Sequence, residues 1–347
     1  MFSFKLFLLI LFAVEEIIKL YSKRTPHALP LPCLTPNDRP VIGILTQPSK
    51  YTNPQGIKQS YIAASYVKFL ESAGAQVVPI LYDYDEDTLR NIFNKINGVF
   101  FPGGDAEIFI DGKFGKKLTH FSLTGQFLAN LVLDSNNQGF YYPLFGTCLG
   151  HELISVIISG DYDLLSKVNS LNHCNNLEFN QNLNISKIYQ GIPQQIIDYV
   201  RNQQGAFFNH ENAVEYQSYD NDDNLKDFFN ITSYSRDIAN ATRFIASFEG
   251  KNSPVFSWQY HPEKVAFEWK LTDNINHKKE MIEFAQNIAN FVVKEARKNN
   301  NTMDDDTLAR LLINNYNTSR KNDSSFEQSY FFDELGENKI RRKKLFN

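Results

Sequence analysis

The chain has 347 residues, a length that suits one large α/β domain or two smaller domains. Apolar residues make up 42% of it, which is enough for a substantial core and argues against a disordered chain. The formal net charge of -4 argues against a surface that binds polyanions, so nucleic acid is not an expected partner.

The first residues have the order of a secretory signal peptide. Lys5 precedes an apolar run, residues 6–14, that is too short to span a bilayer, and Glu15 and Glu16 follow. We predict a signal peptide over about residues 1–22 and no membrane association after its removal; the alternative is a buried N-terminal helix. Six N-glycosylation sequons support a secretory route: Asn184, Asn230, Asn240, Asn300, Asn317 and Asn322.

The segment from residue 41 to residue 159 alternates short apolar runs with amphipathic stretches. This pattern predicts βαβ units and a parallel sheet, and therefore an α/β fold. The predicted strands are residues 41–46, 77–81, 98–101 and 143–146. The predicted helices are residues 61–74, 85–95, 123–133 and 150–159.

The second half of the chain is less regular. Residues 160–193 show little periodicity and are expected to be irregular or short antiparallel structure. Helices are predicted at 194–201 and 224–229, strands at 231–234, 243–248 and 255–259, and a long helix with an apolar stripe ends near residue 298. The main domain is expected to cover residues 38–298, and residues 299–347 to form an extension that is partly packed on it.

One stretch, residues 143–152 (PLFGTCLGHE), has the form of a strand, a sharp turn and a helix. Glycines on both sides of Cys148 permit a tight elbow, and a thiol at the amino end of a helix is placed to act as a nucleophile. The competing interpretation is a small buried hydrophobic residue, because cysteine is commonly buried. Glycine elbows also serve phosphate sites and plain turns.

A second stretch, residues 256–264 (FSWQYHPEK), ends a predicted strand with a histidine, a proline and a glutamate. A cysteine hydrolase needs a base that takes the thiol proton and returns it to the leaving amine, and a third group that orients the base. Cys148, His261 and Glu263 fit these three roles. Taken alone, His261 would be a surface or capping histidine.

The two stretches together resemble the class I glutamine amidotransferase-like superfamily. The flanking segments VIGIL (41–45), YIAASYVK (61–68), ESAGA (71–75) and NGVFFPGG (97–104) are similar to the γ-glutamyl hydrolase family within it. The likeness continues in HPEK (261–264), EARKNN (295–300) and SSF (324–326). It implies a three-layer αβα sandwich with a mostly parallel, flavodoxin-like central sheet.

The resemblance also implies a chemistry. Cys148 would cleave γ-glutamyl bonds of folate polyglutamates and related γ-glutamyl conjugates through a thioester, with the N–H groups of Gly104 and Leu149 as the oxyanion hole. Gly103 and His210 would lie beside the substrate. No cofactor or metal is implied, a homodimer is possible, and the expected location is a lysosome, a vacuole or the outside of the cell. A depressed thiol pKa is expected, to keep the enzyme active in a mildly acidic compartment.

Two other functions are compatible with the sequence. A glutamine amidotransferase-type glutaminase would share the elbow and the His-Pro-Glu motif, but it would also need a synthase partner to receive ammonia. A catalytically inactive secreted binding glycoprotein could use the same fold. The chain has three cysteines, so an oxidising compartment would allow a bridge between Cys33 and Cys174 and leave Cys148 free.

Overall fold

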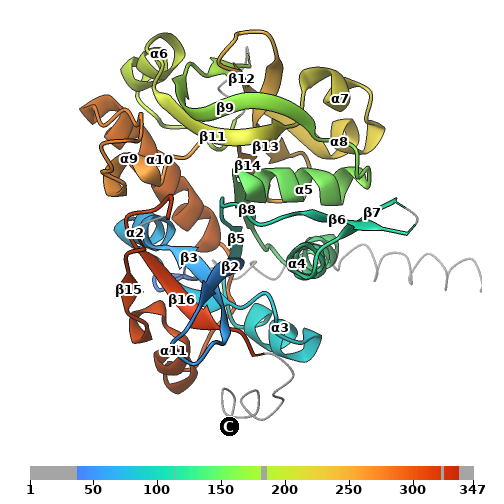
Figure 1. Ribbon diagram of the computed structural model, residues 1–347, viewed down its shortest axis with the longest axis vertical. Helices are drawn as coiled ribbons and strands as arrows, with labels where there is room; N and C mark the ends of the chain where they lie inside the picture. The colour runs from blue at the N-terminus through green and yellow to red at the C-terminus, as the bar shows by residue number, and fades with distance from the viewer. Residues whose placement is uncertain (1–36, 114, 181–185, 322–323, 336–347) are drawn as a thin grey trace, which may run out of the picture. The chain divides into compact units, whose positions relative to one another are not determined.

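The computed structural model describes residues 37–113, 115–180, 186–321 and 324–335 (Figure 1). The proposed signal peptide, Cys33, Asn184 and Asn322 lie outside the described residues. Cys174 is a buried free thiol whose Sγ donates to the carbonyl oxygen of Asn274 at 2.9 Å. No helix within the described ranges has the length and apolar content needed to cross a bilayer.

The centre of the protein is an eight-stranded sheet with the order β10-β12-β13-β14-β8-β5-β1-β4. The five strands from β4 to β14 are parallel, and in chain order they follow the 2-1-3-4-5 arrangement of flavodoxin-like folds. The other three are antiparallel. The α/β expectation, with a mostly parallel sheet, is confirmed. The bounds are β1 Val41–Leu45, β4 Gln76–Ile80, β5 Gly98–Phe101, β8 Leu144–Thr147, β10 Glu178–Phe179, β12 Phe229–Arg236, β13 Arg243–Gly250 and β14 Val255–Trp258.

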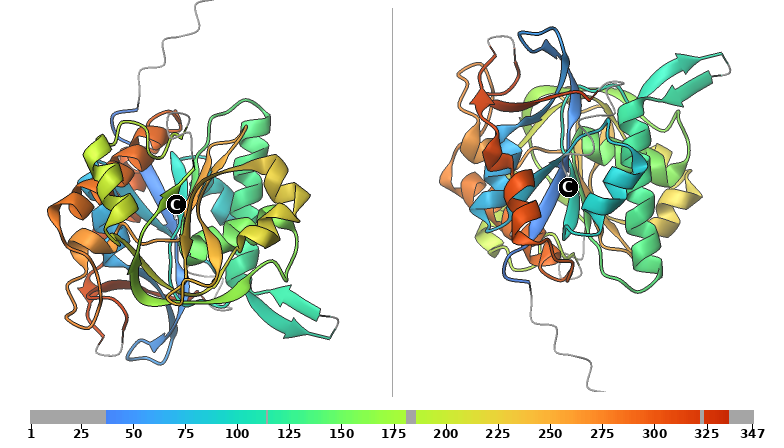
Figure 2. Two further views of the ribbon diagram at one scale, coloured as in Figure 1. Left: turned by 90° about the horizontal axis from the view of Figure 1, so that it is seen from above. Right: turned by 90° about the horizontal axis from the view of Figure 1, so that it is seen from below.

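Helices cover both faces of this sheet (Figure 2). One face carries α2 and α10, and the other carries α3, α4 and α5. Strands β1, β5, β8 and β14 are buried along their whole length, and β4 is buried after Gln76, because both faces of the sheet are covered; this explains their mostly apolar sequences. The helices are α2 Ala64–Ser72, α3 Glu86–Phe93, α4 His120–Asn137, α5 Leu149–Ser159, α6 Gln194–Asn202, α7 Tyr216–Asp220, α8 Asp223–Phe228, α9 Lys264–Phe267, α10 Lys279–Ala296 and α11 Asp305–Leu311.

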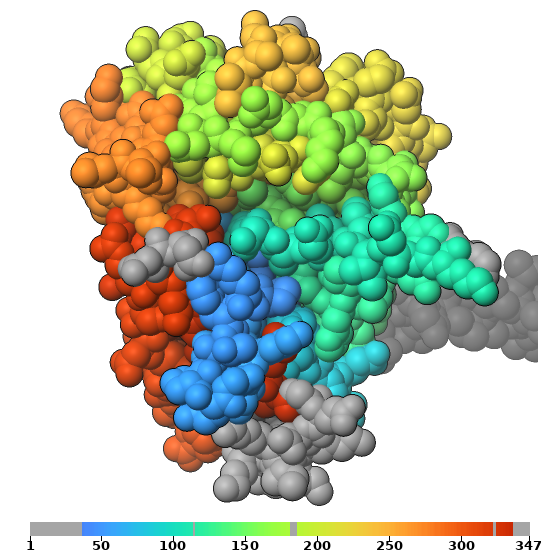
Figure 3. Space-filling view, in the orientation of Figure 1, coloured from blue at the N-terminus to red at the C-terminus, as the bar shows by residue number. Residues whose placement is uncertain are grey.

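A second sheet joins the two ends of the described chain. It has the order β15-β16-β3-β2, with β2 Gln47–Thr52, β3 Lys58–Ala63, β15 Thr318–Ser319 and β16 Ser329–Asp333. The prediction of a helix from residue 61 was therefore wrong for its first three residues, because residues 61–63 pair with β16. In Figure 3 the C-terminal segment lies beside these first strands on one face.

The segment after residue 298 buries apolar side chains of its own. Leu308 and Leu311 on α11, Ile313 on the short 3-10 helix Ile313–Asn315, and Phe332 on β16 are at most 6% exposed. These residues are part of the same apolar cluster as the main sheet.

The residues predicted to be irregular or short antiparallel structure contain a long strand, β9 (Ser166–Asn175), which pairs antiparallel with β11 (Ala206–Ala213). The apolar alternation of β9 is weak because one of its inward positions is Ser170. A separate hairpin of β6 (Phe109–Gly112) and β7 (Gly115–Leu118) projects from the body (Figure 2).

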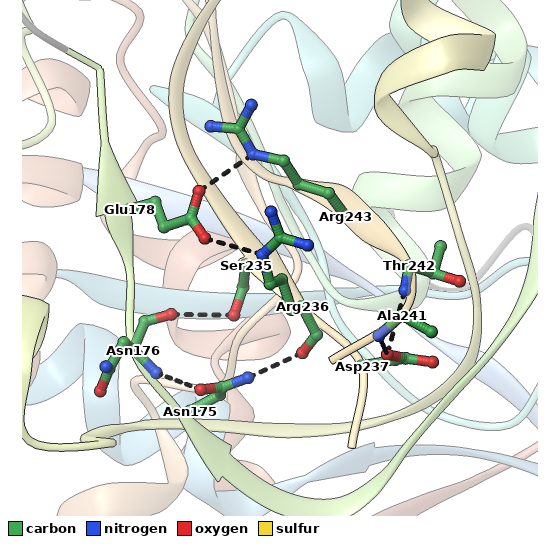
Figure 4. A network of polar contacts seen from close by, with 9 residues as sticks. All are labelled: Asn175, Asn176, Glu178, Ser235, Arg236, Asp237, Ala241, Thr242 and Arg243. Atoms are coloured by element: carbon green, nitrogen blue, oxygen red, sulfur yellow. Dashed lines mark hydrogen bonds and ion pairs between the residues drawn. The ribbon is translucent and has the colours of Figure 1, made fainter. Parts of the chain in front are cut away.

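Edge strand β10 is attached to the sheet by side chains as well as by its short backbone ladder (Figure 4). Glu178 accepts from Nε of Arg236 at 3.1 Å and from Nε of Arg243 at 3.0 Å. The Arg243 guanidinium also lies 3.7 Å from the ring centroid of Tyr234. These partly exposed pairs hold the short strand in register, a modest contribution of about 1 kcal/mol each at most.

Candidate active site

Cys148 stands between strand β8 and helix α5 in an unusual backbone conformation. Its φ is 51° and its ψ is -110°, a region that non-glycine residues rarely occupy and that costs of order 1–3 kcal/mol. The start of α5 lies so close to β5 that a Cβ at position 150 would be 2.0 Å from the carbonyl oxygen of Phe101, which excludes a side chain there. The geometry is that of a strained strand-to-helix elbow that presents its thiol at the carboxyl edge of the sheet.

The sheet register brings the second stretch to the same edge. Strands β8 and β14 are parallel neighbours, with Thr147 paired to Trp258, so their carboxyl ends lie side by side. The N–H of Cys148 donates to the carbonyl oxygen of Trp258 at 2.8 Å. His261 follows Trp258 by three residues, and its N–H donates to the carbonyl oxygen of Phe207 on β11 at 2.9 Å.

His261 is held in one tautomer by a carboxylate. Its Nδ1 lies 2.7 Å from Oε1 of Glu263, and the two side chains are 3% and 1% exposed. Because a carboxylate only accepts, Nδ1 carries the proton and donates it to Glu263, which leaves Nε2 of the neutral ring as an acceptor. Nε2 has no hydrogen-bond partner among the described residues. The ring is therefore ready to take a proton through Nε2.

Gly103 marks the point where the nucleophile and the base converge. A Cβ placed on Gly103 would lie 2.9 Å from Cβ of Cys148, 3.0 Å from Cε1 of His261 and 2.5 Å from the hydroxyl of Tyr66. Cys148 and His261 also line one cavity. Two side chains that the sequence separates by more than a hundred residues thus meet beside Gly103.

The loop that carries Gly103 and Gly104 is fixed by side chains from the second sheet and from α2. The N–H of Gly103 donates to the Tyr66 hydroxyl at 2.8 Å, and that hydroxyl lies 3.4 Å from Nδ1 of His261. Nε2 of Gln47 donates to the carbonyl oxygen of Pro102 at 3.0 Å. Sequence reasoning missed both Tyr66 and Gln47, because their contacts depend on the fold rather than on a motif.

The predicted oxyanion hole consists of two backbone N–H groups, those of Gly104 and Leu149. The Leu149 N–H, at the start of α5, forms a hydrogen bond with Cys148 that lowers the pKa of the thiol. The Gly104 N–H makes no hydrogen bond within the described part of the chain, and Gly104 lines the same cavity. Both residues thus line the cavity that contains the thiol.

His210 lies on β11 and also lines the cavity. Its Nδ1 donates to the carbonyl oxygen of Asn212 at 2.8 Å, and its Nε2 has no partner among the described residues. Burial lowers the pKa of His210 to about 3, so the imidazole is neutral. A neutral ring with an unoccupied acceptor nitrogen can bind a donor group of a substrate.

The electrostatics of the thiol differ from the sequence expectation. Burial raises the pKa of Cys148 well above its usual value, and the carboxylates of Glu152 and Glu263 add to this. The Leu149 N–H and the Lys264 ammonium act in the opposite direction without outweighing it. The expected depressed pKa was wrong for the substrate-free protein, because burial shifts the pKa of the thiol in the opposite direction.

Glu152, in the first turn of α5, was not foreseen as a site residue. It is 4% exposed, it lines the cavity, and its Oε1 accepts from Nε2 of Gln259 at 2.9 Å. Burial raises the pKa of Glu152 to about 8, against the opposing effects of Gln259 and Lys167. The residue is therefore a neutral acid below that pH. Among the described residues, no group of three His, Cys, Asp or Glu side chains is placed to hold a metal ion.

Comparison with known proteins identifies relatives of this chain. The family model for peptidase C26 matches residues 40–263. γ-Glutamyl hydrolase B of Dictyostelium discoideum is 36% identical over 90% of this chain and 90% of its own length, and the γ-glutamyl hydrolase of Homo sapiens is 34% identical over 85% and 90%. A solved glutamine amido transferase from Methylobacillus flagellatus aligns at 9% identity and a TM-score of 0.45, over 77% of this chain and 98% of that one. The family match and the two hydrolases show that the chain belongs to the peptidase C26 family.

Proposed function

We propose that this protein is a cysteine hydrolase that cleaves γ-glutamyl amide bonds, with folate polyglutamates and related γ-glutamyl conjugates as substrates. The observation that carries the proposal is the convergence of Cys148 and His261 beside Gly103, with the free Nε2 of an oriented imidazole in the same cavity as the thiol. The names of the curated relatives supply the γ-glutamyl substrate class.

The reaction begins at the thiol of Cys148. Nε2 of His261 takes the proton from Cys148 as the sulfur forms a bond to the γ-carbonyl carbon. The carbonyl electrons move to oxygen, where the N–H groups of Gly104 and Leu149 stabilise the oxyanion by a few kcal/mol. Glu263 stabilises the imidazolium that forms.

Collapse of this intermediate breaks the carbon–nitrogen bond. The imidazolium gives its proton to the departing amine, and the acyl group remains on Cys148 as a thioester. A water then gives a proton to Nε2 of His261 and attacks the thioester carbon. The carbon–sulfur bond breaks, the thiol recovers its proton, and the γ-carboxylic acid leaves.

The test is hydrolysis of a pteroylpentaglutamate by the purified protein, with products separated by chain length. We expect shortened pteroylglutamates from the unsubstituted protein and none from Cys148→Ala. Cys174→Ala is the matched control, since it removes a second buried cysteine that does not line the cavity. Turnover by Cys148→Ala would refute the assignment of the nucleophile. Ammonia released from free glutamine, with the pentaglutamate left intact, would favour a glutaminase.

We also propose a secretory route, with glycosylation at exposed asparagines. The sequon asparagines within the described ranges, Asn230, Asn240, Asn300 and Asn317, are all exposed. Endoglycosidase treatment of the protein from a eukaryotic host should lower its apparent mass. An unchanged mass would contradict the proposed route.

A further inference from the structure

The catalytic cavity is poor in positive charge for an enzyme that acts on carboxylates. Its lining includes four acidic side chains, those of Asp105, Glu107, Glu152 and Glu211. Within the described part of the chain, the lysine and arginine side chains that line it are two, Lys167 and Lys264. A γ-glutamyl residue carries an α-carboxylate, so one of these two cations is the natural partner for it.

Lys264 differs from Lys167 in its burial. Lys167 is exposed, whereas Lys264, the first residue of α9, is 2% exposed. The Nζ of Lys264 lies 4.4 Å from the ring centroid of Phe326 and 5.8 Å from that of Phe207. Among the described residues no carboxylate lies within ion-pair distance of this ammonium, and no hydrogen bond engages it.

Lys264 is electrostatically coupled to Glu268, whose pKa it lowers, but it forms no ion pair with that carboxylate. A largely buried ammonium that has two aromatic faces and no ion pair is unfavourable for the folded protein. Such an arrangement is typical of a site that awaits a charged ligand. Lys264 and Cys148 line the same cavity, and the field of the ammonium lowers the pKa of the thiol. Phe326 and Phe207 limit the access of water, which strengthens any ion pair formed there.

We propose that Lys264 binds the α-carboxylate of the γ-glutamyl residue whose amide bond is cleaved. This inference rests on the proposed function and makes it more specific. Three carbon atoms separate the α-carboxylate of a γ-glutamyl group from its γ-carbonyl. An α-carboxylate bound to Lys264 would therefore fix the distance between the γ-carbonyl and Cys148. An α-linked peptide or an uncharged amide could not form this ion pair.

The first experiment compares two chromogenic substrates in Lys264→Met. Both substrates are γ-linked p-nitroanilides, so their common leaving group has no carboxylate. They differ in the γ-glutamyl part, which has a free α-carboxylate in one substrate and an α-carboxamide in the other. We expect kcat/KM for the carboxylate substrate to fall about 100-fold or more, as for removal of one partner of a buried ion pair. For the carboxamide substrate, kcat/KM should change by less than about threefold, because this substrate has no carboxylate that could pair with Lys264.

Lys167→Met is the matched control, because it removes the same charge from an exposed position on the same cavity. Because water screens the exposed charge of Lys167, this substitution should change kcat/KM for either substrate by no more than about threefold. Equal losses on both substrates in Lys264→Met would overturn the proposal, because they would indicate a general effect on the thiol. A loss seen only when the leaving group is glutamate would also overturn it, because the cation would then serve the departing residue.

The second experiment measures binding without turnover. In a Cys148→Ala background, calorimetry would compare an N-acyl-γ-glutamyl amide that has a free α-carboxylate with its α-carboxamide. We expect Lys264→Met to weaken only the carboxylate ligand, by about 100-fold. Equal affinities with and without Lys264 would refute the inference, even if the protein hydrolyses γ-glutamyl bonds. The urea midpoint of Lys264→Met should equal or exceed that of the unsubstituted protein, because a buried unpaired charge is replaced by an apolar side chain.

Discussion

The buried carboxyl of Glu152 makes the stability of this protein depend on pH in a defined direction. Burial raises its pKa from the usual 4.5 to about 8. Between these values the folded protein keeps a proton that the unfolded chain has lost. Unfolding therefore releases a proton, and the free energy of unfolding falls as the pH rises from 4.5 to 8.

The size of the effect follows from the same two pKa values. The difference between a pKa of 4.5 and a pKa of about 8 corresponds to a change of about 5 kcal/mol in the free energy of unfolding, at about 1.4 kcal/mol per pKa unit. Water that reaches the cavity will stabilise the ionised form of Glu152. The expected loss in the free energy of unfolding is therefore about 2–5 kcal/mol. Glu152→Gln keeps the shape and can still bond to Gln259, but it cannot ionise. The variant should match the unsubstituted protein near pH 4.5 and exceed its stability by this amount near pH 9.

Urea unfolding at several pH values measures this difference directly, provided that the slopes of the transitions agree. Glu211→Gln is the control, since it removes an exposed carboxylate from the same cavity. It should change the free energy of unfolding by no more than about 0.5 kcal/mol at any pH. A constant offset between Glu152→Gln and the unsubstituted protein from pH 4.5 to 9 would refute the reasoning.

Three further substitutions test the site and its support. Tyr66→Phe leaves the Gly103 N–H without its acceptor, so kcat should fall by about tenfold or more with little change in KM; steady-state kinetics showing unchanged kcat would contradict this. Gly150→Ala places a Cβ 2.0 Å from the carbonyl oxygen of Phe101, and circular dichroism and activity should show a misfolded or inactive protein. Phe332→Ala empties a site that is 2% exposed and should cost about 3–5 kcal/mol in urea unfolding, whereas a loss below 1 kcal/mol would mean that β16 contributes little.

Strands and helices with local signals could be predicted from the sequence. Strands β5 and β8 are short apolar runs bounded by turn residues, and glycines at the elbow identify the turn around Cys148. The proximity of His261 could be inferred too, because parallel strands place their carboxyl ends at one edge of a sheet. The motif residues were thus accessible without coordinates.

The missed features depend on partners that are distant in the chain. Residues 61–63 form a strand because β16 pairs with them, and nothing local marks them as different from the helix that follows. Tyr66 lies in the predicted helix 61–74, and only the fold shows that its hydroxyl reaches Gly103. The thiol pKa was misjudged because the helix amino end was considered without the burial and the nearby Glu152 and Glu263.

The pairing of β16 with β3 has a consequence for biosynthesis. Gln59 and Asp333, which are bonded across this pair, are 274 positions apart. At ordinary rates of translation, a ribosome needs roughly 15–50 s to make the intervening chain. During that interval β3 can pair with β2 but not with β16, and the aromatic wall that Phe326 adds to the cavity is missing. The growing polypeptide can therefore assemble the elbow and the imidazole early, yet it completes the catalytic cavity only when its final strand arrives.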